Sequence, residues 1–204
     1  MTYSRFRGPL TWAALALVLV VPLWAAAHSP LLAWRQPVYI LAGFAGIAAF
    51  GLACLQPLLA VGLVPDLPLS RSRWLHRGLG ILLLASVVLH VAGLWLTSPP
   101  DVVDALLLRS PTPFSPFGVA AMWALFGVAG LAALRGRLPF RYPHWRLAHT
   151  ALGVVVLVGT VAHALLIEGT METVTKYALC GFALFSAGLA LTMVRKRRKG
   201  PLNT

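Results

Sequence analysis

Six long apolar stretches constrain this chain more than any other feature of its sequence. They lie at approximately residues 10–27, 37–61, 74–97, 116–134, 144–167 and 174–194. Each is long enough to cross the ~30 Å hydrocarbon core of a bilayer as an α-helix. Of the 204 residues, 59% are hydrophobic and 11% are charged, which lies outside the usual range of soluble domains. We therefore expect an all-α, polytopic membrane protein in which residues 1–204 form a single domain, a six-helix transmembrane bundle.

The basic residues gather in alternate connections between these stretches. Fourteen of the 17 Lys and Arg residues precede the first stretch, follow the sixth, or lie in or beside the second and fourth connections. Four of the five acidic residues lie in the other connections. By the positive-inside rule both termini are expected in the cytoplasm, as six crossings require. The net charge of +12 thus reflects membrane topology, and we expect contact with membrane lipid and no nucleic-acid partner.

Two of the stretches carry a pair of histidines at the same spacing. His76 and His90 lie in the third stretch, and His149 and His163 lie in the fifth, 14 residues apart in each case. Fourteen residues turn an α-helix through about 1400°, roughly 40° short of four turns, and advance it about 21 Å. Each pair therefore shares one helix face at two depths. Since both stretches run outward, His76 and His149 are expected near the inner surface, with His90 and His163 near the outer.

Ionisable side chains within spanning helices are costly, and they usually mark a functional site inside the bundle. A flat macrocycle between two helices needs one axial nitrogen from each side, which the inner and the outer histidine pair would each supply. We therefore expect two haem groups whose irons bind these four histidines. A zinc site would need more ligands near one point than either level offers. A proton path would normally include Asp or Glu, which both stretches lack.

Small and basic residues surround the histidines at matched positions. Gly80 and Gly153 follow the inner histidines by four residues, so they lie on the same helix faces. Ser86 and Gly159 precede the outer histidines by four residues. We expect all four to leave clearance for a macrocycle. Three arginines near the inner site are candidates for contacts with haem propionates, although a cytoplasmic boundary also favours cations: Arg73, Arg77 and Arg146.

The pattern His76-x13-His90 and His149-x13-His163, on the third and fifth of six helices, resembles the ferric-reductase-like transmembrane domain. That domain is the membrane core of ferric reductases and NADPH oxidases, and the resemblance covers the second to sixth stretches. In the family, two histidine pairs bind two b-type haems that pass electrons across the membrane. The resemblance implies that His76 and His149 hold the inner haem b and His90 and His163 the outer one.

Larger members of this family continue into a flavin- and nicotinamide-binding region, whereas this chain ends at Thr204. We therefore expect a short bacterial form, a multi-pass protein of the inner membrane that is the electron-transfer subunit of an oxidoreductase. Its donor would be a separate cytoplasmic flavoprotein reductase or a quinol, and flavin would enter only through such a partner. The acceptor on the outer side would be a protein or a small molecule.

Two alternatives remain at this point. The same histidine spacing occurs in the cytochrome b of quinol-oxidising complexes, which place the paired helices in a different order and carry a Pro-Glu-Trp-Tyr motif that this sequence lacks. A quinol-linked cytochrome b subunit is therefore the second haem interpretation. A non-redox membrane scaffold or transporter, whose histidines only bridge helices, is the alternative from another class.

Overall fold

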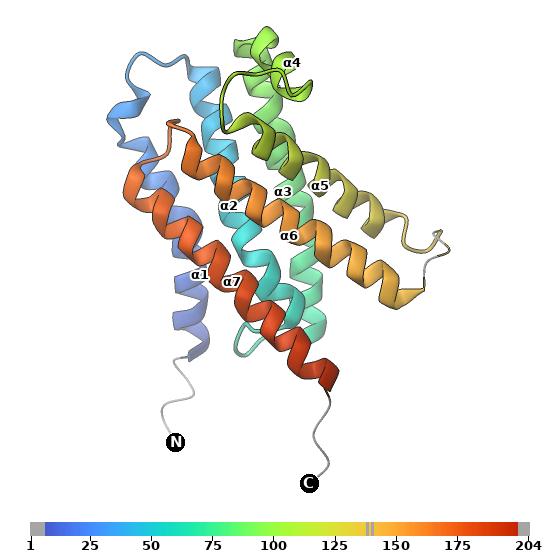
Figure 1. Ribbon diagram of the computed structural model, residues 1–204. Helices are drawn as coiled ribbons and strands as arrows, with labels where there is room; N and C mark the ends of the chain where they lie inside the picture. Colours follow the sequence, from blue (N-terminus) through green and yellow to red (C-terminus); the bar gives the residue numbers. More distant parts are fainter. Residues whose placement is uncertain (1–6, 138, 140, 200–204) are drawn as a thin grey trace.

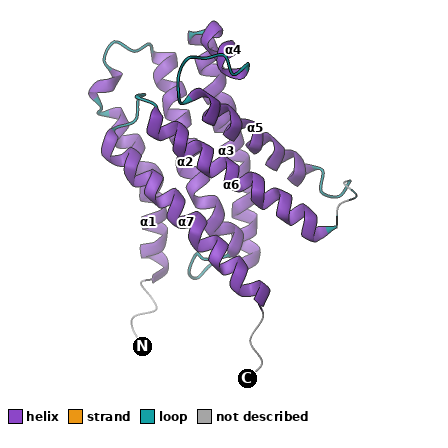
Figure 2. Ribbon diagram, in the orientation of Figure 1, coloured by secondary structure: helices purple, strands orange, loops and turns teal. Residues whose placement is uncertain are grey.

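Helices make up the regular structure in the described part of this computed structural model, residues 7–137, 139 and 141–199 (Figures 1 and 2). The elements are α1 (Arg7–Ala27), the short 3-10 helix η1 (Pro30–Leu32), α2 (Pro37–Val61), α3 (Leu69–Thr97), α4 (Pro99–Leu106), α5 (Ser115–Ala133), α6 (Tyr142–Leu166) and α7 (Thr173–Lys199). Within the described ranges, six of these helices are long and apolar enough to cross a membrane: α1, α2, α3, α5, α6 and α7. The prediction of an all-α, six-span membrane protein is confirmed.

Two helices extend beyond the predicted apolar stretches. α3 begins at Leu69, five residues before the predicted start at 74, because Pro68 has extended backbone and the helix can begin directly after it. The buried hydroxyl of Ser72 donates to the carbonyl of Leu59 at 2.7 Å, which holds this polar first turn against α2. α7 continues to Lys199, past the predicted end at 194, because Lys and Arg are good helix formers. Hydropathy alone underestimated both helices.

The bundle is built from two helical hairpins around α2. α2 packs against α3, α5 packs against α6, and α2 also contacts α1, α6 and α7. In Figure 1, α1 begins and α7 ends at the same end of the bundle as the turn between α2 and α3. η1, α4 and the connection from α6 to α7 lie at the opposite end. The connections that hold most cations are thus separated from those that hold most acids.

The main core contains buried residues from five spanning helices. One from each helix is Phe50, Leu83, Leu125, Leu157 and Ala183. Close helix approach is possible where glycines replace larger side chains. A Cβ at Gly51 of α2, for example, would lie 2.6 Å from a methyl group of α1. Such close contact between small residues is typical of membrane helix packing.

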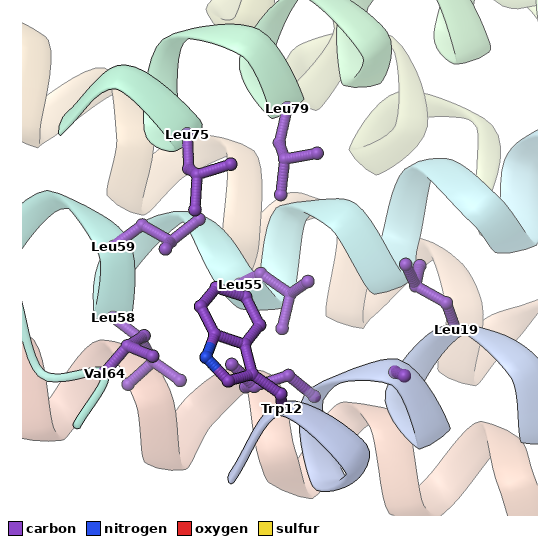
Figure 3. A pocket seen from close by; sticks show the side chains of 10 residues that line it. Trp12, Leu19, Leu55, Leu58, Leu59, Val64, Leu75 and Leu79 are labelled. Carbon is purple, nitrogen blue, oxygen red and sulfur yellow. The ribbon is translucent and has the colours of Figure 1, made fainter. Parts of the chain in front are cut away.

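A groove of about 240 Å³ lies at one side of the bundle, between α1, α2 and α3 (Figure 3). Trp12 and Leu19 of α1, Leu55 of α2, and Leu75 and Leu79 of α3 point into it. All of its lining residues are apolar, and none is a histidine. The groove is therefore separate from the histidine pairs.

Candidate functional site

The inner histidines, His76 of α3 and His149 of α6, meet in the bundle. Their ring centroids are 6.3 Å apart, and the ring planes are inclined by 65°. α3 and α6 are not one of the packed helix pairs of the described chain, since α3 packs mainly on α2 and α6 on α5. The two rings thus face each other between helices that otherwise make little contact.

The ring separation at this level suits a metal bound from two opposite sides. Two imidazoles that each bind one metal ion at about 2 Å have ring centroids roughly 6 Å apart. The described residues include no group of three or more His, Cys, Asp or Glu side chains that could hold a metal ion. A pair of histidines fits haem, because the macrocycle provides the other four ligands of its iron.

The outer histidines have hydrogen-bond partners that define their tautomer. His90 Nδ1 lies 2.7 Å from the carbonyl oxygen of Ala42 in α2, and His163 Nδ1 lies 3.1 Å from that of Phe114, directly before α5. Because a carbonyl only accepts, each Nδ1 must carry the hydrogen and donate it. In the neutral ring, Nε2 is then unprotonated and free to bind a metal. The two rings are near enough for their charges to interact.

Each outer histidine also packs against a glycine one turn after its carbonyl partner. A Cβ at Gly46 would lie 2.9 Å from His90 Nδ1, and one at Gly118 would lie 2.6 Å from His163 Nδ1. Ala42 and Phe114 are 72 residues apart, as are Gly46 and Gly118. The two hairpins therefore repeat one device, in which a carbonyl and a glycine of the first helix fix a histidine ring of the second.

The inner histidines have unlike neighbours. The side-chain amide of Gln56 in α2 reaches the ring of His76, with 2.7 Å between an amide atom and Nδ1. The ring of His149 stacks on Trp145 at a centroid distance of 5.0 Å and an angle of 18°. Nδ1 of His149 is buried without a hydrogen-bond partner among the described residues. The inner pair thus lacks the symmetry of the outer pair.

Trp145 is itself held from two sides. Its indole Nε1 donates to the carbonyl of Leu131 in α5 at 2.8 Å. The guanidinium of Arg135 lies 4.5 Å from the Trp145 ring centroid and 4.7 Å from that of Tyr142. Cation–π contacts of this kind stabilise a ring by about 0.5–1 kcal/mol at exposed sites. This stack connects the basic end of α5 to the inner histidine.

The small residues predicted to give clearance differ in their surroundings. No described atom lies within 4 Å of a Cβ built at Gly153, and the nearest to one at Gly80 is the end of Gln56, at 3.8 Å. A Cβ at Gly159 would instead lie 2.9 Å from the carbonyl of Phe117, so this glycine lets α6 pack on α5. The hydroxyl of Ser86 donates to Leu82 of its own helix at 2.8 Å. Open space therefore lies beside the inner histidines, and helix packing occupies Gly159.

The predicted arginines do not contact the histidine rings. Arg73 and Arg77 are exposed, and Arg146 is partly buried. Among the described interactions, none is a hydrogen bond or ring contact from these three side chains to an inner histidine. The remaining histidines, His28 and His144, are exposed and lie outside the pairs, with His28 Nδ1 2.8 Å from the carbonyl of Trp24.

Sequence reasoning missed Ala42, Gly46, Phe114 and Gly118 because their partners lie some 48 residues away along the chain. The 72-residue repeat of the two glycines, beside the 73-residue repeat of the histidines, was the available signal. Gln56 also had a signal, since it is the only side-chain amide within the second apolar stretch. Trp145 precedes His149 by one helical turn and thus lies on the same face.

Comparison with known proteins gives one family match. The model of the family "Ferric reductase like transmembrane component" matches residues 43–160, which is more than half of the chain. This region includes His76, His90 and His149 and ends three residues before His163. Searches of curated proteins and of solved structures found no match. The length of the family match shows that this chain belongs to the ferric reductase like transmembrane family.

Proposed function

We propose that this protein is a di-haem b-type cytochrome that carries electrons from a donor on the cytoplasmic side to an acceptor on the outer side. Its family indicates electron transfer in a membrane and typically binds haem. The observation that supports the proposal most directly is the meeting of His76 and His149 across α3 and α6, with 6.3 Å between ring centroids. The repeated support of His90 and His163 favours a second site of the same kind.

In this proposal, His76 and His149 are the axial ligands of the inner haem, and His90 and His163 those of the outer haem. Bound haem supplies an iron that alternates between the ferric and ferrous states, so that one electron is carried at a time. The carbonyls of Ala42 and Phe114 keep hydrogen on Nδ1 of the outer histidines, which leaves Nε2 available for the metal. The apolar helices around the histidines exclude water and provide a low dielectric constant.

The direction of transfer follows from the proposed topology, in which both termini face the cytoplasm and residues 1–204 act as one domain. The clustering of α1's beginning, the α2–α3 turn and α7's end at one end of the bundle supports this (Figure 1). The donor would be a separate flavoprotein reductase or a quinol, and the acceptor a protein or small molecule outside. The chain would then be the electron-transfer subunit of an oxidoreductase in a bacterial inner membrane.

Absorption spectra of the purified protein test the haem assignment. We expect a Soret band, an α band on reduction, and about two haems per chain in a pyridine haemochromogen assay. A folded but colourless protein would refute the proposal in favour of histidines that only bridge helices. Single substitutions of His76 or His149 by Ala should remove one haem, and those of His90 or His163 the other. His28→Ala and His144→Ala are matched controls that should retain both.

Proteoliposomes test the direction. Vesicles of known protein orientation would contain a reduced flavoprotein or a quinol on the side of the termini and a ferric chelate on the other side. We expect reduction of the chelate only when donor and acceptor are separated in this order by the protein. Equal rates in the reversed arrangement would contradict the proposed direction while leaving the haem assignment intact.

A further inference from the structure

Gln56 is a polar residue of a membrane-spanning helix that contacts the inner histidine at three points. With its amide nitrogen toward His76, that nitrogen lies 2.7 Å from His76 Nδ1 and 3.0 Å from the His76 carbonyl oxygen. The amide oxygen then lies 3.3 Å from the backbone nitrogen of Gly80. The side chain of α2 thus spans one turn of α3, from the histidine to the residue one turn later.

An amide differs from the carbonyls that support the outer histidines, because it both donates and accepts. When the amide nitrogen donates to Nδ1, the ring hydrogen of neutral His76 must lie on Nε2. A nitrogen that carries hydrogen in this way cannot bind a metal ion. When Nε2 binds a metal, Nδ1 carries the hydrogen, and its partner must be an acceptor. Rotation of the Gln56 amide by half a turn would present its oxygen to Nδ1.

We infer that Gln56 is a positioning residue for His76, which holds the ring in both tautomers and accepts from Nδ1 when Nε2 binds the inner haem. This inference rests on the proposed function, because it assigns Gln56 a role toward a haem ligand. The amide would fix the orientation of the ring through its contacts with the backbone of α3. Its oxygen would make the imidazole a stronger electron donor to the iron.

The repeat between the two hairpins explains why only one inner histidine has such a partner. The offset of 72 residues that relates Gly46 to Gly118 relates Gln56 to Val128 of α5. Valine cannot form a hydrogen bond through its side chain, and Nδ1 of His149 accordingly has no partner among the described residues. The inner site is therefore asymmetric, with a hydrogen-bonded ligand on α3 and an unbonded ligand on α6.

Gln56→Leu removes the amide while keeping a side chain of similar size. Loss of an outer-shell partner typically lowers metal affinity 10- to 100-fold. Because the hydrogen bond favours ferric iron, we expect the midpoint potential of one haem to rise and that of the other to stay constant. A tenfold preferential loss of ferric binding corresponds to about 59 mV for one electron. Potentiometric titration of the purified protein measures both potentials.

Ser72→Ala is the matched control. Its hydroxyl also joins α3 to α2, through the 2.7 Å bond to Leu59, but it touches no histidine. Both variants should lower the melting temperature, whereas only Gln56→Leu should shift a potential. Unchanged potentials in Gln56→Leu, or equal shifts of both haems, would overturn the inference. A shift of the same potential in Ser72→Ala would overturn it as well, because general loosening of the helices would then explain both.

A measurement on haem-free protein tests the contact without the loaded form. ¹⁵N NMR of histidine-labelled protein, assigned with His76→Ala, should show His76 with its hydrogen on Nε2, and Gln56→Leu should weaken this preference. An unaltered His76 tautomer in Gln56→Leu would refute the contact. Wild-type protein that binds no haem would refute the proposed function together with this role. Two haems at unshifted potentials in Gln56→Leu would refute the role of Gln56 alone.

Discussion

Gly118 lies so close to the ring of His163 that one added methyl group must displace the ring or separate α5 from α6. A Cβ at this position would lie 2.6 Å from Nδ1 and 3.0 Å from Cε1, whereas ordinary contacts begin at 3.4 Å. The required shift in Gly118→Ala is therefore about 0.8 Å at Nδ1. Metal–ligand distances vary by only about 0.2 Å, so a ring displaced this far could not keep its bond to the iron.

The energetic cost has three parts. Overpacking a well-packed interior costs about 1–3 kcal/mol. Weakening the hydrogen bond from His163 to the Phe114 carbonyl costs about 1 kcal/mol more. Replacement of glycine by alanine in a helix returns roughly 0.5–1 kcal/mol. We therefore expect Gly118→Ala to lower the free energy of unfolding by roughly 1–3 kcal/mol and to impair the outer haem site.

Haem content and midpoint potentials test this expectation. Purified Gly118→Ala should retain about one haem per chain, with the spectrum and potential of the inner site unchanged. Gly130→Ala is the matched control in the same helix, because no described atom lies within 4 Å of the position that its added methyl group would occupy. It should retain both haems. Two haems at unchanged potentials in Gly118→Ala would refute the proposed support of His163, as would an equal loss in Gly130→Ala.

Three further predictions concern other contacts. Gly46→Ala should affect the same haem as Gly118→Ala, because its Cβ would lie 2.9 Å from Nδ1 of His90; loss of the other haem would contradict the outer pairing. Trp145→Ala should speed the transfer of the inner haem to apomyoglobin, with Trp145→Phe intermediate, because stacking on His149 contributes about 0.5–1.5 kcal/mol; identical transfer rates would exclude this support. Glu172 accepts from two backbone N–H groups in the first turn of α7, which lowers the pKa of its carboxyl group. The stabilisation is thus present above the ordinary carboxyl pKa and is lost as the pH falls through the lowered pKa. The melting-temperature difference between wild type and Glu172→Gln should therefore shrink in acid, and a difference independent of pH would refute this role.

The sequence alone determined the six spanning helices, because a bilayer demands about 20 apolar residues in each crossing and this requirement is visible in every stretch. It was less informative at the helix ends. The first turn of α3 is polar, and only the contact of Ser72 with Leu59 shows why it is helical. The matched spacing of the histidines was also readable, since helix geometry is local and converts sequence separation into face and depth.

Only the tertiary structure decided which groups support each histidine ring. The partners of His90 and His163 are backbone carbonyls, which every residue possesses, so residue identity could not mark Ala42 or Phe114. Which carbonyl meets which ring depends on the register between two helices of a hairpin. That register is set by close packing at glycines such as Gly46 and Gly118, far along the chain from the histidines they touch. Local helix geometry therefore fixed where the histidines lie, and interhelical packing fixed how their rings are held.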